Sequence, residues 1–400
     1  MSKLVIKLKG KSDAWSEMYG IVLWGFVLRA VVLIIMLSIK SRVAPYFIAD
    51  DISYEATAQR YLFGAAGVFD FPYLNRMLDD YIQPFWPMVL CLSAKLFGTI
   101  YAGRMINILL STACIPVIYK TVLLLSGNAK TAKTAGKLFA FLPLPVLVCC
   151  FPIKDTFLTL TVLYAFYMFL LVSKEQHVGF FRLALCAVGL VCTYFTRGAV
   201  AELMLIFFFM LWINALIKEK RYIALCGVVL LAGVLLVFFG KDVLESFQTK
   251  IDDYSNQESQ GALAMLQMTS ITQIYKLPFA YAFATLQPMT LNYLGKSSSF
   301  WMWLMSFSNI TMYPVAIANM LYVVCKKHNF LYWLCGLVMY CAIISMCLGI
   351  FRHYMFLLPL QIINCALCFD RKKPGMKQLV LLGSMGMVAL VSLYSLLAFI

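Results

Sequence analysis

The sequence predicts an all-α polytopic membrane protein with about 11 transmembrane helices. Of its 400 residues, 62% are hydrophobic and only 13% are charged, against about 45 to 50% and about 25% in soluble domains. So few polar side chains cannot cover a water-facing surface, which excludes a soluble protein. Spans of about 20 residues each leave room for two sizeable loops but for no separate soluble domain, so residues 1–400 are expected to form a single membrane domain.

Basic residues give the orientation, because Lys and Arg concentrate in the short cytoplasmic loops of membrane proteins. Four lysines precede the first apolar run, so the N-terminus is expected in the cytoplasm. Later basic turns then follow on the same side: Lys130, Lys133 and Lys137; Lys174 and Arg182; Lys218 to Arg221; Lys326 and Lys327; and Arg371 to Lys377. The net charge of +15 therefore reflects topology, and no nucleic-acid partner is expected.

In chain order, the expected spans are 20–39, 104–125, 138–152, 155–173, 182–197, 200–217, 222–239, 301–324, 330–350, 354–369 and 378–400. The first has no small-residue cleavage site and reads as an anchor. The apolar stretch 84–98 is expected to lie on the outer leaflet, because another crossing there would put Lys130 to Lys137 outside. Residues 40–103 and 240–299 become the two long outer loops, and the C-terminus lies outside.

Two adjacent carboxylates, Asp50 and Asp51, open an amphipathic stretch in the first outer loop. Tyr54, Ala58 and Tyr61 follow at helical spacing, which predicts a helix with one apolar face. Either carboxylate can cap the N-terminus of this helix. Either can also accept a proton from a substrate hydroxyl, so structural and catalytic roles are both open.

Other charged residues are expected on the same outer face, namely Arg60, Arg76, Lys154, Asp155, Arg197, Arg352 and His353. Charge at membrane depth is costly, so this grouping predicts a polar cavity in which cations hold a phosphate and a carboxylate acts as base. Snorkelling towards the headgroups is the alternative for Lys154 and Arg352. Only Arg29 lies clearly inside a span.

Four stretches resemble the polyprenyl-phosphate-dependent glycosyltransferases of the GT-C class, including the protein mannosyltransferase and lipid A aminoarabinose transferase group. Asp50-Asp51 with Tyr54 and Ala58, after an Arg in the first helix, is similar to the family's first acidic motif. The run from Gln83 to Gly98 followed by Arg104 and Asn107 resembles its interfacial helix. Pro152-Ile153-Lys154-Asp155 is similar to the second acidic site, and Arg352-His353-Tyr354 with Pro359 resembles the late motif. The family's first motif is often Asp-Glu, whereas this chain has Asp-Asp.

The resemblance implies a membrane glycosyltransferase with juxtamembrane helices in its first outer loop. A sugar on a polyprenyl phosphate or diphosphate would be transferred, with inversion, to a glycan or lipid acceptor in cell-surface glycan assembly. Asp50 is the expected base, and Asp51 its neighbour that orients the acceptor or an ion. The expected substrate- and phosphate-binding residues are Tyr54, Arg60, Lys154, Asp155, Arg197, Arg352 and His353.

Cofactor and class stay open at this point. No cofactor is required by the sequence, although Asp50, Asp51 and Asp155 could supply oxygen ligands to a divalent metal. A lipid-linked polysaccharide polymerase or ligase is the nearest alternative, and a lipid or solute transporter is the alternative from another class. The short basic loops favour a multi-pass protein of a bacterial plasma membrane.

Overall fold

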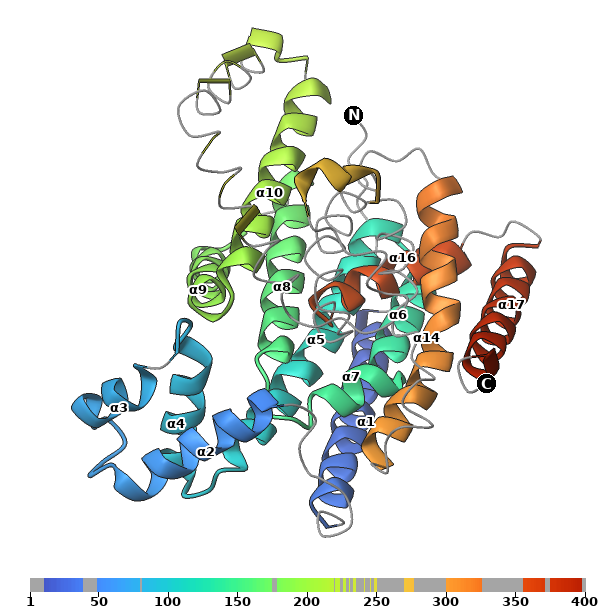
Figure 1. The fold of residues 1–400 in the computed structure, drawn as a ribbon. Helices are drawn as coiled ribbons and strands as arrows, with labels where there is room; N and C mark the ends of the chain where they lie inside the picture. Colours follow the sequence, from blue (N-terminus) through green and yellow to red (C-terminus); the bar gives the residue numbers. More distant parts are fainter. Residues whose placement is uncertain are drawn as a thin grey trace. The chain divides into compact units, whose positions relative to one another are not determined.

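A computed structural model describes residues 11–38, 49–79, 81–174, 178–218, 270–276, 300–325, 355–370 and 375–397, with scattered positions between 220 and 249. Within these residues all regular structure is helical (Figure 1). The α-helices are α1 (Lys11–Ser38), α2 (Ala49–Gly64), α3 (Phe71–Leu78), α4 (Phe85–Phe97), α5 (Ala102–Ser126), α6 (Ala129–Phe141), α7 (Pro143–Val148), α8 (Asp155–Ser173), α9 (Phe180–Thr196), α10 (Gly198–Lys218), α14 (Phe300–Cys325), α16 (Leu358–Asp370) and α17 (Met376–Leu397), and η2 (Ile271–Lys276) is a 3-10 helix.

The all-helical prediction is confirmed for this part of the chain. Among the described residues, four helical stretches are long and apolar enough to cross a membrane: Met18–Ser38, Ala102–Ser126, Asp155–Ser173 and Met376–Leu393. The stretch predicted to lie on the membrane surface forms α4, whose 13 residues extend about 20 Å and fall short of the hydrocarbon core of about 30 Å. The predicted spans 222–239 and 330–350 lie largely or wholly outside the described residues, as does most of the outer loop 240–299.

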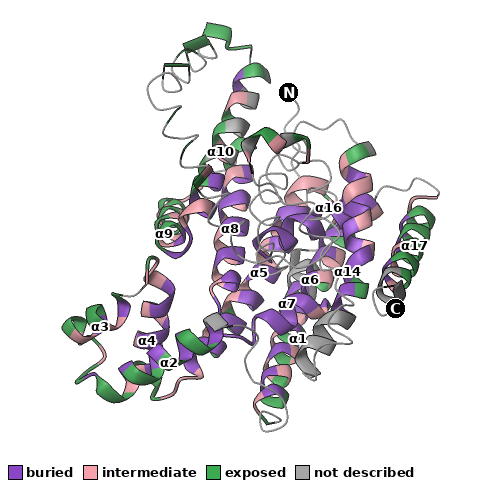
Figure 2. Ribbon diagram, viewed as in Figure 1, coloured by how far each residue is buried: buried purple, intermediate pink, exposed green. Residues whose placement is uncertain are grey.

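Some helix faces carry exposed apolar side chains, whose contact with water is unfavourable. On α17, Leu379, Leu382, Met385, Leu390 and Leu393 are each more than half exposed, and Figure 2 shows most of this helix as exposed surface. Contiguous exposed apolar surface of this kind marks contact with lipid or with another protein. Together with the long apolar helices, it is consistent with a membrane protein.

The predicted span 138–152 is wrong in its bounds. Helix α6 begins at Ala129, so the supposed cytoplasmic turn at Lys130 to Lys137 is helical. Asn128 starts it, because its side-chain oxygen accepts the Lys130 amide at 2.9 Å, and the Ala and Lys that follow favour helix. At the other end, Pro143 interrupts the helix and begins the six-residue α7, because proline has no N–H to continue the ladder.

Residues 49–97, which belong to the predicted first outer loop, fold as three short helices that pack on one another, α2, α3 and α4 (Figure 1). The amphipathic spacing predicted for α2 is confirmed, since Tyr54, Ala58 and Tyr61 are all buried. Tyr54 and Ala58 form an apolar cluster with Trp86, Leu90 and Ala94 of α4. The segment is therefore helical as predicted, and burial of the apolar faces of its helices holds them together.

Helix α3 begins with a side-chain cap on its first turn. Asp70 accepts the amide of Tyr73 at 3.2 Å and that of Ala66 at 3.0 Å. These two donors favour the ionised carboxylate and lower the pKa of Asp70 below its ordinary value. Asp70 thus has an ordinary structural role and serves as a reference for the other carboxylates of the loop.

By packing, the chain divides into two compact units. The first comprises Met1–Ala201, Met289–Tyr322 and Met355–Ile400; the second comprises Glu202–Pro288 and Val323–Tyr354. In the first unit, α5 packs against α1, α6 and α8, and α6 also packs against α16. The side chains that form the sites described below belong to this first unit.

Candidate functional site

An ion pair between the first outer loop and α5 lies at the centre of the site. Arg104 Nε donates to Glu55 Oε1 at 2.5 Å, and both side chains are almost completely buried. Arg104 Nη1 also donates to the backbone oxygen of Cys150 at 3.1 Å. One guanidinium therefore links α2 to the turn between α7 and α8.

Asp51 lies one helical turn before Glu55 on α2, so the two carboxylates share a face of the helix. Its side chain is also fully buried. Because uncompensated buried charge is unfavourable, two buried carboxylates one turn apart on a helix require nearby cations and donors. We call Asp51, Glu55 and Arg104 the Arg104 cluster.

Side chains from α4 and α5 donate a hydrogen bond to each backbone carbonyl of the turn at residues 150–153. Asn107 Nδ2 donates to the oxygens of Phe151 and Ile153 at 2.6 and 2.8 Å, and Trp86 Nε1 donates to that of Pro152 at 3.0 Å. Buried carbonyls without partners would be costly. The bonds therefore fix this turn, and with it the start of α8, against the first outer loop.

Helix α8 begins next to charged side chains and has no side-chain cap on its N-terminus. Lys154 directly precedes the helix, and its Nζ contacts Gln83 Oε1 at 3.4 Å. Asp155 is the first helical residue, and its Oδ1 lies 3.9 Å from Arg197 Nη1. A helix N-terminus carries partial positive charge and free amides, so two cations and a helix end meet here with one carboxylate.

Two buried polar atoms beside this turn have no hydrogen-bond partner within the described part of the chain, Thr156 Oγ1 and Asn107 Oδ1. Native proteins leave few such atoms unsatisfied, and each one suggests a bound water, ion or ligand. Thr156 Oγ1 can donate to an anion, and it belongs to the first turn of α8. We call Lys154, Asp155, Thr156 and Arg197 the α8 N-terminal site.

Arg29, the cation inside the first span, is completely buried by structural contacts. Its Nη1 donates to the oxygens of Gly25 and Ala140, its Nη2 to Phe139 O, and its Nε to Ser111 Oγ, at 2.9 to 3.1 Å. In a continuous helix the amide at position 143 would bond Phe139 O, but Pro143 has none. Arg29 thus satisfies carbonyls that the break between α6 and α7 exposes.

The predicted site residues fall into three groups. Lys154, Asp155 and Arg197 come together at the start of α8, and Asp51 is buried on α2 as part of the Arg104 cluster. Tyr54 packs in the apolar core of the loop, and exposed Arg60 contacts Thr57 Oγ1 at 3.4 Å. Arg352, His353 and the side chain of Asp50 lie outside what the structure describes.

Sequence reasoning did not assign a role to Glu55, although it is the residue that pairs with Arg104. Two signals were present. Glu55 follows Asp51 by four residues, which places it on the same helical face, and Arg104 with Asn107 had been noted only as part of a family resemblance. The partner of a buried carboxylate 49 residues away in sequence was not evident from spacing alone.

No three His, Cys, Asp or Glu side chains of the described residues are grouped as a metal site would require. The α8 N-terminal site instead combines Asp155 with cations, a donor set that suits an anion better than a divalent metal. Comparison of the sequence with protein-family models and with curated proteins gave no match.

Proposed function

We propose that the protein is a membrane glycosyltransferase that moves a sugar from a polyprenyl-phosphate donor to an acceptor hydroxyl. The observation that carries this proposal is the uncapped N-terminus of α8, flanked by Lys154 and Arg197 and linked through the 150–153 turn and Arg104 to the buried Glu55 of α2. A phosphate site beside a carboxylate is what transfer from a lipid phosphate needs.

The α8 N-terminal site is the proposed phosphate site. Lys154 and Arg197 supply two positive charges against the single negative charge of Asp155, and the helix end adds a partial positive charge. Arg197 lies 3.9 Å from Asp155, so its guanidinium places a positive charge beside the start of α8. The Thr156 hydroxyl supplies a further donor to phosphate.

Asp51 is the proposed base, and this revises the sequence-based preference for Asp50. The acceptor oxygen attacks the anomeric carbon, the bond from that carbon to the phosphate oxygen breaks, and the hydroxyl proton passes to Asp51. Polyprenyl phosphate leaves with the bonding electrons, and the sugar configuration inverts. Cations at the α8 N-terminal site stabilise the charge that develops on the leaving phosphate.

The contacts of Arg29 support an enzyme over a transporter. A transport path is expected to carry polar groups through the depth of the membrane. Arg29 is bonded on several sides to backbone oxygens and Ser111, so it completes the helix packing and does not line such a path.

The test measures sugar transfer by detergent-purified protein from synthetic polyprenyl-phosphate and polyprenyl-diphosphate sugars to a panel of acceptors. Loss of a general base lowers turnover by about a hundredfold to ten-thousandfold, so we expect this loss in kcat for Asp51→Asn. We expect Thr156→Val to raise KM for the donor, because it removes one hydroxyl at nearly constant volume.

Asp70→Asn is the matched control, because it removes a carboxylate from the same loop while the amide still caps α3. It should transfer at the parental rate. Parental kcat in Asp51→Asn, with the same size-exclusion profile, would rule out the carboxylate mechanism. Transfer only from the diphosphate donors would favour a polysaccharide polymerase or ligase.

A further inference from the structure

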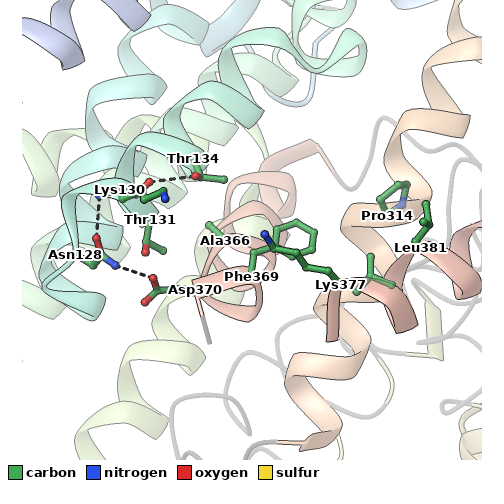
Figure 3. A pocket seen from close by; sticks show the side chains of 11 residues that line it. Asn128, Lys130, Thr131, Thr134, Pro314, Ala366, Phe369, Asp370, Lys377 and Leu381 are labelled. Carbon is green, nitrogen blue, oxygen red and sulfur yellow. Dashed lines mark hydrogen bonds between the residues drawn. The ribbon is translucent and has the colours of Figure 1, made fainter. Parts of the chain in front are cut away.

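A cavity lies far from the Arg104 cluster, where α6 and α17 begin and α16 ends (Figure 3). Its volume is about 660 Å³. Helix α5 runs from the Arg104 cluster to the Gly127-Asn128 link at this cavity, and the helical rise from Arg104 to Ser126, 22 positions later, is about 33 Å. The cavity is therefore separate from the α8 N-terminal site.

One wall of the cavity is polar and belongs to the start of α6. Lys130, Thr131 and Thr134 line it, and Lys377 of α17 also contributes. Thr131 is 4% exposed, and its Oγ1 is a buried atom with no hydrogen-bond partner among the described residues. A buried hydroxyl on the lining of a cavity, in the first turn of a 13-residue helix, points to a ligand that accepts a hydrogen bond there.

The charges around the cavity favour an anion. Among the described residues that line the cavity, Lys130 and Lys377 oppose one carboxylate, that of Asp370, and its Oδ1 already accepts the Asn128 side-chain amide at 2.7 Å. Asn128 in turn caps α6 through Lys130 N. The polar end of the cavity thus has net positive charge, and the helix end of α6 adds to it.

The remaining walls are apolar, with Pro314 of α14, Ala366 and Phe369 of α16, and Val380 and Leu381 of α17. A small hydrated anion gains nothing from such walls. A molecule with a phosphate at one end and a hydrocarbon chain at the other would contact both parts of the cavity.

We propose that this cavity binds a membrane phospholipid, with its phosphate at Lys130, Thr131 and Lys377 and an acyl chain along Pro314, Phe369 and Leu381. The basic segments at both cavity edges are those that the charge distribution predicts to face the cytoplasm. The lipid would therefore come from the cytoplasmic leaflet, opposite the proposed transfer site, and would join α6, α16 and α17.

Native mass spectrometry of the full chain, purified in mild detergent and titrated with dioleoyl phosphatidylglycerol, tests the proposal. The Lys130→Gln/Lys377→Gln variant should lower the fraction of protein with bound lipid by about tenfold, and Thr131→Val by several-fold. Lys137→Gln is the matched control, because it removes the same charge from the exposed side of α6 without touching the cavity. It should bind as the parent does.

Two further binding measurements distinguish a phospholipid from a neutral lipid and from free phosphate. Dioleoylglycerol, which lacks the phosphate, should not bind, and millimolar inorganic phosphate should not displace the phospholipid. The proposal would be overturned if Lys137→Gln lost as much lipid binding as Lys130→Gln/Lys377→Gln. It would also be overturned if dioleoylglycerol bound as well as the phospholipid does. Displacement by inorganic phosphate would identify the free anion as the ligand and overturn the lipid assignment. Thr131→Val keeps the side-chain volume, so a folded variant with unchanged lipid binding would also contradict it.

Discussion

Glu55 and Arg104 are buried together, so each charge depends on the other for its stability. Removing one partner of a buried pair typically costs about 3 to 5 kcal/mol, because the remaining charge stays buried and uncompensated. We therefore expect Glu55→Gln and Arg104→Met each to lower the free energy of unfolding by about 3 to 5 kcal/mol. Arg104→Met should cost more, since it also removes the bond to Cys150 O. Equilibrium unfolding of purified protein in mixed detergent measures both.

The double variant gives the sharper result. With both partners removed, no unpaired charge remains, so Glu55→Gln/Arg104→Met should be less destabilised than the sum of the single variants. Arg76→Met is the control for the loss of an arginine charge, because the Arg76 side chain is exposed. Its guanidinium lies over the Tyr73 ring, 5.4 Å from the ring centre. Strict additivity in the cycle would show that the two charges do not interact as described.

At the level of single residues, the sequence predicted which charged residues are grouped better than it predicted which of them pair. Asp51, Lys154, Asp155 and Arg197 were predicted from charge in an apolar chain, because buried charge is expensive wherever it occurs. Which charges meet depends on packing between distant segments, such as Asp155 with Arg197 across α8 and α9. Spacing along one helix carries no information on that packing.

The break between α6 and α7 provides a test at the level of secondary structure. Arg29→Met should destabilise the protein, because hydrogen bonds to a charged group contribute about 1.5 to 3 kcal/mol each. In a Pro143→Ala background, residue 143 regains an N–H that can bond Phe139 O. We therefore expect Arg29→Met to cost less in that background than in the parent.

The same unfolding assay measures this cycle, with Arg60→Met as the control at an exposed position. A coupling of about 0.5 to 3 kcal/mol is typical of residues in one hydrogen-bond network. An identical cost of Arg29→Met with and without Pro143 would mean that the guanidinium does not substitute for the missing amide.

Helix positions could be predicted where one physical rule acted alone. The bounds of α8 match the predicted 155–173, because its apolar run is flanked by charge at both ends. The span at 138–152 was misplaced because the charge rule treated Lys130 to Lys137 as a loop, whereas lysine and alanine also favour helix. Pro143 and Pro145 within that run were the available signal for a break.

The orientation of the whole molecule remains a prediction from charge, and it can be tested in intact cells. Gln59→Cys and Asn75→Cys, at exposed positions of α2 and α3, should react with a membrane-impermeant maleimide. Lys137→Cys and Lys377→Cys should react only after the membrane is made permeable. All four variants carry Cys226→Ser, which removes an exposed cysteine that would itself react. Their labelling is compared with that of the Cys226→Ser protein alone.

This labelling also tests whether α4 lies on the membrane surface. If α4 crossed the membrane, every later segment would change sides, and Lys137→Cys would be labelled from outside while Gln59→Cys stayed accessible. That pattern would place the cavity at α6 outside and contradict the cytoplasmic origin of its lipid. Labelling of neither Gln59→Cys nor Asn75→Cys would reverse the orientation of the first outer loop.

The contacts of Arg29 have a consequence for biosynthesis. Its acceptor at Ala140 lies 111 residues later in the chain, which a ribosome adding about 5 to 20 residues per second reaches after about 6 to 22 s. Until then the first predicted span enters the lipid with Arg29 bonded to Gly25 O of its own helix but without the acceptors that α6 supplies. That costs about 2.5 to 3.5 kcal/mol, whereas the Leu, Ile, Val and Phe residues between positions 18 and 38 contribute about 4 to 7 kcal/mol in favour of insertion. Insertion of the first helix is therefore favourable even before α6 has been synthesised.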